Sequence, residues 1–168
     1  MASPSETGAT RPLETPLLAY RIADGRHPLL DCTGAALHGG RWNSPGRRVI
    51  YAALSYAGAM LERLAQSGIG RVPGNLRCIE ITLPAHAVVE EVTVDSLPGW
   101  DAADRIASRA RGDEWHAGRR SLALLVPSVV GQPFERNVLI NQDHPDFELV
   151  RASKPRRMRW DERIFGRL

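Results

Sequence analysis

Five side chains in this sequence have the chemical types needed to hold and cleave a charged, partly aromatic ligand. They are Arg21, Arg41, Tyr51, Glu62 and Ser128. An arginine presents a rigid fork of donors that fits a phosphate, and a charge-assisted hydrogen bond contributes roughly 1.5–3 kcal/mol. A tyrosine can stack on a planar ring and also donate a hydrogen bond. A carboxylate stabilises the positive charge that develops when a glycosidic bond breaks.

These residue types together suit cleavage of an N-glycosidic bond in a nucleotide that carries a pyrophosphate. A structural alternative uses the same residues. In it Arg41 and Glu62 form an ion pair, Tyr51 belongs to the core, and Ser128 caps a turn after Pro127. The residues alone leave both interpretations open.

Several other site classes find no support in the sequence. No G-x-G-x-x-G and no G-x-x-x-x-G-K-[ST] motif is present, which removes the usual dinucleotide and P-loop fingerprints. The five histidines lack H-E-x-x-H or paired spacing, so we expect no metal site. Nothing resembles the G-x-S-x-G elbow that a serine hydrolase would need around Ser128.

Length and composition predict one soluble globular domain. The chain has 168 residues, of which 43% are apolar and 24% charged. The net charge is only +3, but basic residues cluster between Arg151 and Arg159. Such a run is usually a solvated face, so a nucleic-acid-binding protein or ribonuclease is the weaker alternative. The same basic segment could instead meet an acidic protein partner.

Cysteine usage and hydropathy favour a cytoplasmic protein. Cys32 and Cys78 are far apart and form no C-x-x-C motif, which fits a reducing compartment. No apolar run approaches the roughly 20 residues that cross a bilayer, so we expect no membrane association. Residues 1–8 lack the apolar region of a signal peptide.

Hydrophobic periodicity predicts an α+β fold with mainly antiparallel sheet and a few flanking helices. We expect a flexible leader over residues 1–15 and a single domain over 16–168, with residues 26–40 forming a loop. The predicted strands are 17–22, 47–52, 76–83, 88–92, 122–126 and 137–141, with an edge strand or tail after 158. The predicted helices are 55–66, ended by Gly68, and 101–111, followed by a turn or short helix at 113–119.

The helix over 55–66 carries Glu62 and has two distinguishable faces. Helical spacing predicts that Leu54, Ala57, Leu61 and Leu64 form its buried stripe. Ser55, Gly58, Ala59 and Glu62 share another side. The small residues there either leave open space beside Glu62 or let another segment approach closely.

The sequence resembles the RES domain family, named after an Arg, a Glu and a Ser. Its first half matches in Tyr20-Arg21, in His38-Gly39-Gly40-Arg41-Trp42-Asn43-Ser44, and in Val49-Ile50-Tyr51-Ala52-Ala53 running to Leu61-Glu62. Its second half matches in Val126-Pro127-Ser128, in Glu135-Arg136-Asn137-Val138-Leu139-Ile140-Asn141, and in His144-Pro145. The resemblance covers residues 17–165, with the motifs in the family's order.

The resemblance implies a bacterial toxin with a fold similar to ADP-ribosyltransferases. RES proteins consume NAD as their substrate without a metal, by hydrolysis or phosphorolysis in some members, whereas others transfer ADP-ribose to a protein. Such a toxin is neutralised in a hetero-oligomeric complex by a small Xre-like antitoxin, which blocks the NAD pocket and provides the only link to DNA. The site residues that the resemblance implies are Arg21 and Arg41 at the pyrophosphate, Tyr51 at the nicotinamide, Glu62 at the ribose, and Ser128 and Asn137 beside them.

Overall fold

A curved mixed sheet forms the centre of the molecule in the computed structural model, which describes residues 9–67 and 74–166. Its strands are β1 (Arg11–Pro12), β2 (Leu17–Asp24), β3 (Val49–Ala53), β4 (Leu76–Leu83), β5 (Val88–Glu91), β6 (Ala123–Pro127), β7 (Arg136–Asn141), β8 (Arg151–Ala152) and β9 (Arg156–Arg157). The helices are α1 (Thr33–His38), α2 (Tyr56–Ser67) and α3 (Ile106–Gly118), with 3-10 turns η1 (Pro145–Leu149) and η2 (Glu162–Phe165).

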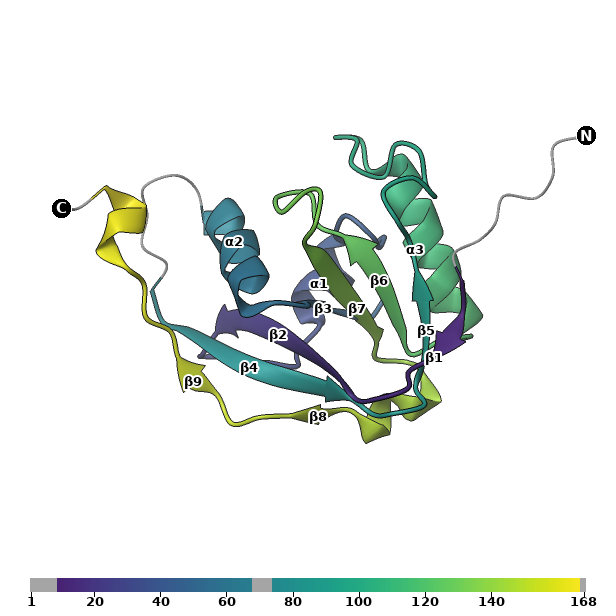
Figure 1. Cartoon of the computed structure of the whole chain (residues 1–168), viewed down its shortest axis with the longest axis horizontal. Coiled ribbons are helices and arrows are strands. Elements are labelled where there is room, and N and C mark those ends of the chain that lie inside the picture. The colour runs from purple at the N-terminus through teal and green to yellow at the C-terminus, as the bar shows by residue number, and fades with distance from the viewer. Residues whose placement is uncertain (1–8, 68–73, 167–168) are drawn as a thin grey trace, which may run out of the picture.

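The strand order is β1-β5-β6-β7-β3-β2-β4-β8, and β9 also pairs with β4 (Figure 1). Among the described strands the β5–β6 pair is parallel and every other pair is antiparallel. The predicted α+β class with mainly antiparallel pairing is therefore confirmed. No helix of the described ranges is both long and apolar enough to cross a membrane.

The central strands are buried on both faces, and each face contributes to its own core. In β6, Ala123 and Leu125 join one hydrophobic cluster, while Leu124 and Val126 join the other. This division follows from the period of two in a strand, which sends successive side chains to opposite faces. The second cluster lies under α3, whose Trp115 is fully buried in it.

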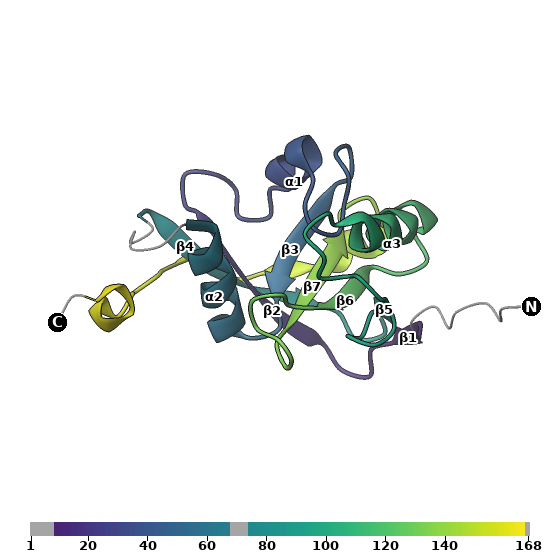
Figure 2. The same cartoon turned by 90° about the horizontal axis from the view of Figure 1, so that it is seen from above.

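The helices stand over different parts of the sheet. Helix α2 contacts β2 and β3, whereas α3 lies near β5 and β6 (Figure 1). Seen from above, this arrangement places β3 and β7 between the two helices (Figure 2).

The predicted buried stripe of α2 is wrong at Ala57 and Leu61, whereas Leu54 packs against the first cluster and Leu64 is half-buried. Leu61 is 40% exposed and Ala57 is exposed, whereas the buried residues of the helix are Gly58 and Ala59. A Cβ atom at Gly58 would lie only 2.6 Å from Oε2 of Glu135. The small residues therefore let α2 approach the segment before β7, and Leu61 is left on the outer side. The predicted stop at Gly68 lies outside the described residues.

Three predicted boundaries also differ from the structure. Residues 26–40 are not all loop, because they contain α1. The two helical pieces predicted at 101–111 and 113–119 are one helix, which begins only at Ile106 because Arg105 has a left-handed φ of 60°. The ordered domain begins before residue 16, since β1 pairs with β5 and Leu13 is buried.

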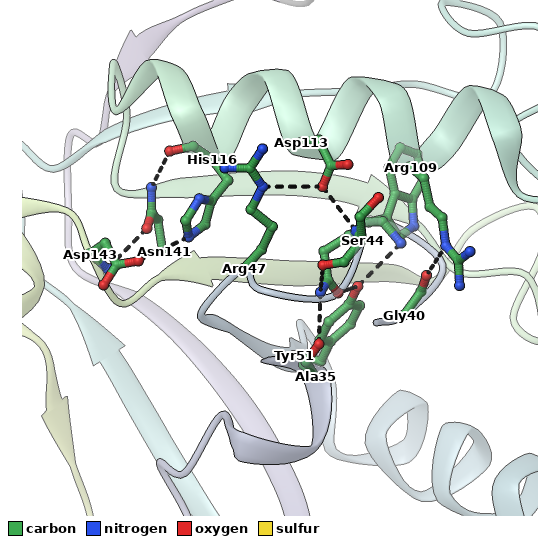
Figure 3. Close-up of polar contacts among 12 residues, drawn as sticks. Ala35, Gly40, Ser44, Arg47, Tyr51, Arg109, Asp113, His116, Asn141 and Asp143 are labelled. Carbon is green, nitrogen blue, oxygen red and sulfur yellow. Dashed lines mark hydrogen bonds and ion pairs between the residues drawn. The ribbon is translucent and has the colours of Figure 1, made fainter. Parts of the chain in front are cut away.

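His116 on α3 is buried, and its main chain is hydrogen-bonded to Asn141 of β7 (Figure 3). Its carbonyl accepts a hydrogen bond of 3.0 Å from Nδ2 of Asn141. Burial lowers the pKa of His116 below its ordinary 6.5, although Asp143, 3.3 Å from its Nε2, acts in the opposite direction. The unfolded chain therefore binds more protons than the folded chain as the pH falls through 6.5.

We therefore expect acid to destabilise the protein partly through His116. Its contribution is fully present above pH 6.5 and is lost as the pH falls toward the lowered pKa. In His116→Gln the decline in the free energy of unfolding below pH 6.5 should be shallower, as measured by urea titration at several pH values. The exposed His27→Gln serves as the control. Equal pH dependence in His116→Gln and the wild type would contradict the assignment.

Candidate active site

One cavity of about 560 Å³ lies between β2, β3, α2 and the loop that follows α1. This volume is within the roughly 300–1,000 Å³ usual for small-molecule sites. The cavity is lined by five of the six predicted site residues: Arg21, Arg41, Tyr51, Glu62 and Asn137. Ser128 is buried behind its wall, between the lining residues Pro127 and Val129. The basic segment 151–159 forms β8 and β9 on the edge of β4 and contributes nothing to the cavity.

The Glu62 carboxylate is held by two side chains from the other end of the chain. Ser128 Oγ donates a hydrogen bond of 2.8 Å to Oε1 of Glu62, and Asn137 Nδ2 donates one of 2.6 Å to the same oxygen. Ser128 Oγ in turn accepts from the N–H of Gly131 at 3.1 Å. Oε1 is therefore fixed, while Oε2 accepts no hydrogen bond from the described residues. Ser128 orients the carboxylate instead of presenting a free hydroxyl to ribose or phosphate.

Tyr51 presents its ring to the cavity while its hydroxyl is fully engaged. The hydroxyl donates to Oδ1 of Asn43 at 2.6 Å and accepts from the Trp42 N–H at 3.2 Å. Burial raises the pKa of Tyr51 above its ordinary value, with the Trp42 N–H acting in the opposite direction. The hydroxyl therefore stays protonated near neutral pH. Only the ring is left to contact a ligand.

Arg41 does not form the structural ion pair with Glu62. Its Nη1 donates to the carbonyl oxygens of Ala102 at 2.9 Å and Trp100 at 3.3 Å. Its Nε and Nη2 have no partner in residues 9–67 and 74–166. Burial, followed by the charge of Arg105, lowers the pKa of Arg41, but an arginine remains a cation near neutral pH. Arg41 thus keeps donors and charge for an anion.

Arg21 is used differently, because all three of its nitrogen atoms donate to the backbone. Nε donates to the Leu29 carbonyl at 2.7 Å, Nη1 to the Tyr51 carbonyl at 2.7 Å, and Nη2 to the Asp31 carbonyl at 3.0 Å. These bonds join β2 to β3 and to the segment before α1. Although Arg21 lines the cavity, its guanidinium is fixed by three main-chain carbonyls, and one N–H on each of Nη1 and Nη2 remains beyond those bonds.

Helix α3 holds the arginine loop, which we define as residues 39–48. Ser108 Oγ donates to the Arg41 carbonyl at 2.8 Å, and Arg109 Nε donates to the Gly40 carbonyl at 2.9 Å. Asp113 accepts from the Ser44 N–H at 2.9 Å (Figure 3). The loop therefore lies against one side of α3, which positions Arg41 and the backbone around Tyr51.

Gly112 allows this contact. A Cβ atom there would lie 1.7 Å from the carbonyl oxygen of Trp42, far inside van der Waals distance. Any larger residue would force the arginine loop away from α3.

Prediction from the residue types overlooked three contributors to the site. Asn43 is completely buried and bonds Tyr51, and its place inside the His38–Ser44 motif was the available signal. Arg63 and Arg105 also line the cavity. Arg63 directly follows Glu62 in the sequence, but Arg105 gave no signal because the helix was expected to start earlier. No cluster of three metal-ligating side chains occurs in the described part of the chain.

We expect Gly112→Ala to lower the free energy of unfolding by about 1–3 kcal/mol, because overpacking displaces the arginine loop. Chemical denaturation measures this change. Gly34→Ala in α1 is the matched control, since a Cβ there meets nothing within 4 Å and should be neutral or slightly stabilising. Equal stability of the two variants would show that α3 and the loop are not in tight contact.

Two named bacterial proteins are similar to this chain over most of its length. The "Prs ADP-ribosylating toxin" of Sphingobium sp. (strain YBL2) is 41% identical over 140 residues, covering 80% of this chain and 86% of that protein. The "Toxin Res" of Photorhabdus laumondii subsp. laumondii is 34% identical over 135 residues, covering 78% and 85%.

A solved structure shares the fold. The toxin–antitoxin complex MbcT–MbcA of M. tuberculosis contains a chain that superposes with a TM-score of 0.67 at 20% sequence identity, covering 86% of this chain and 85% of that one. The RES domain matches residues 18–161, which span nearly the whole ordered region. The chain belongs to the RES domain family.

Proposed function

We propose that this chain is a toxin that consumes NAD by cleaving the bond between nicotinamide and ribose. The arrangement around Glu62 carries the proposal. One oxygen of its carboxylate is fixed by Ser128 and Asn137, and the other has no hydrogen-bond partner among the described residues, in a cavity lined by arginines and a tyrosine. A carboxylate held in this way can stabilise a ribosyl cation without having to reorient.

Each side chain has a distinct task in this mechanism. Arg41 binds a phosphate of NAD through Nε and Nη2, which keeps the dinucleotide in register. The ring of Tyr51 packs against the nicotinamide, while its hydroxyl stays bonded to Asn43. Glu62 stabilises positive charge on the ribose as the C1′–N bond breaks. The bonding electrons leave with nicotinamide, which departs as a neutral molecule, so no proton donor is needed.

The acceptor completes the reaction. Water would give ADP-ribose and a proton, and inorganic phosphate would give ADP-ribose 1″-phosphate. We take degradation by one of these small nucleophiles as the first candidate, because each needs only access to the cavity.

Transfer of ADP-ribose to a protein is the second candidate. The name of the Sphingobium relative, which is 41% identical, favours it. The same bond breaks in both reactions, so the side chains keep their tasks and only the nucleophile differs.

The partner in this proposal is a small antitoxin of the Xre type, which would block the cavity in a hetero-oligomeric complex in the cytoplasm. The fold shared with a chain of a toxin–antitoxin complex supports an antitoxin partner. Any contact with DNA would then go through the antitoxin.

Replacing Glu62 with glutamine tests the proposal directly. Gln keeps an amide oxygen that can accept from Ser128 and Asn137, but it removes the negative charge. We expect the rate of nicotinamide release from NAD by the purified, antitoxin-free protein to fall by about 10²–10³-fold. Glu14→Gln, an exposed carboxylate outside the cavity, should release nicotinamide at the wild-type rate. Equal rates for Glu62→Gln and the wild type would refute the role of Glu62.

The acceptor is identified by incubating the wild type with labelled NAD, with and without phosphate and with and without cell lysate. Free ADP-ribose or its 1″-phosphate as the dominant product supports degradation. A discrete labelled protein band, absent with Glu62→Gln, supports transfer.

A further inference from the structure

A second arginine of the cavity wall has fewer of its donors engaged than Arg21. Arg63 follows Glu62 on α2 and lines the cavity together with Gln66. In the described ranges its guanidinium makes one weak hydrogen bond, from Nη1 to Oε1 of Gln66 at 3.4 Å. Its Nε is buried and has no partner there. A buried donor without a partner is unfavourable, and an anion bound near the guanidinium would offset part of that cost.

The charges around Arg63 do not supply that anion. Asp24, the carboxylate on the same wall of the cavity, is already bonded to Arg26 through both Nε and Nη2. Arg21 adds positive charge close by. Burial lowers the pKa of Arg21, Asp31 opposes this effect, and the charge of Arg63 adds to it. No described carboxylate forms a salt bridge with Arg63, so two neighbouring cations, Arg21 and Arg63, line the cavity.

The two arginines differ in what they can still bind. Each nitrogen of Arg21 donates to a main-chain carbonyl, so moving this side chain onto a ligand would break three hydrogen bonds. Arg63 would lose only the long contact to Gln66. A charged donor that is already desolvated and unpaired gains more from an anion than one that must first be released.

We propose that Arg63, and not Arg21, is the second phosphate-binding arginine of the cavity. Its guanidinium donates to the diphosphate of the dinucleotide, while Arg41 binds the same diphosphate from the arginine loop. A diphosphate carries oxygens on two phosphorus atoms, so it can be held by donors from two elements at once. This assignment rests on the proposed use of NAD.

Binding of ADP-ribose and adenosine to the purified full chain tests the assignment without relying on turnover. Calorimetry with Arg63→Gln should give a dissociation constant for ADP-ribose that is raised about tenfold or more. Adenosine, which has no phosphate, should bind Arg63→Gln and the wild type alike. Arg159→Gln makes the same charge change on the exposed surface and should leave both affinities unchanged.

Two further variants separate binding from folding. Arg63→Lys keeps the charge but loses Nε–H, so its affinity for ADP-ribose should lie between those of Arg63→Gln and the wild type. Arg21→Gln should lower the unfolding midpoint, because three carbonyls lose their donor, whereas Arg63→Gln should not. In NAD turnover, Arg63→Gln should raise KM and leave kcat within about twofold of the wild type.

The outcomes distinguish this inference from the proposed function. Unchanged affinity for ADP-ribose in both Arg63 variants overturns the inference, even if the wild type consumes NAD. A wild type that binds ADP-ribose through Arg63 but releases no nicotinamide from NAD overturns the proposed reaction and leaves the binding residue in place. Equal weakening of adenosine and ADP-ribose by Arg63→Gln would show a general change of the cavity and would also overturn the inference.

Discussion

The pair of hydrogen bonds to Oε1 of Glu62 is the interaction on which the site depends. Glu62 lies on α2, whereas Ser128 directly follows β6 and Asn137 lies on β7. One carboxylate oxygen therefore ties the helix to strands that follow more than 60 residues later in the chain, since the two separations are 66 and 75 residues. The small residues on the inner side of α2 are needed for the same reason, because Gly58 lets the helix come within reach of Glu135.

The rest of the cavity is assembled by hydrogen bonds to main-chain atoms. Arg21 donates hydrogen bonds to three carbonyls. Helix α3 is hydrogen-bonded to main-chain atoms of the arginine loop through Ser108, Arg109 and Asp113. Main-chain atoms held at several points cannot shift independently, so the ring of Tyr51 and the open donors of Arg41 are positioned before a ligand arrives. Such preorganisation matters for a reaction that is accelerated mainly by electrostatic stabilisation.

Local patterns predicted the fold better than they predicted the hydrogen bonds of the site. The alternation of Ile79, Ile81 and Leu83 gave β4 with its observed bounds, because burial on one face imposes a period of two. The apolar spacing in α2 predicted the wrong burial for Leu61, because a helix next to a polar cavity can bury small residues and expose a leucine. Five of the residues that were predicted from residue types and family resemblance line the same cavity. Those predictions could not show that Ser128 serves Glu62, since that contact exists only after folding.

Four arginines line the cavity, namely Arg21, Arg41, Arg63 and Arg105. The sequence alone does not show which of them hold the fold together and which can bind a ligand. What separates them is how many donors remain after folding. Every nitrogen of Arg21 donates to a main-chain carbonyl, whereas in Arg41 only Nη1 donates. Nε of Arg63 is buried and has no partner in the described chain. An arginine with all its nitrogens engaged stabilises the wall, whereas one with an unmet donor stabilises an anion. The same side chain is therefore structural or substrate-binding according to the carbonyls that the fold brings to it.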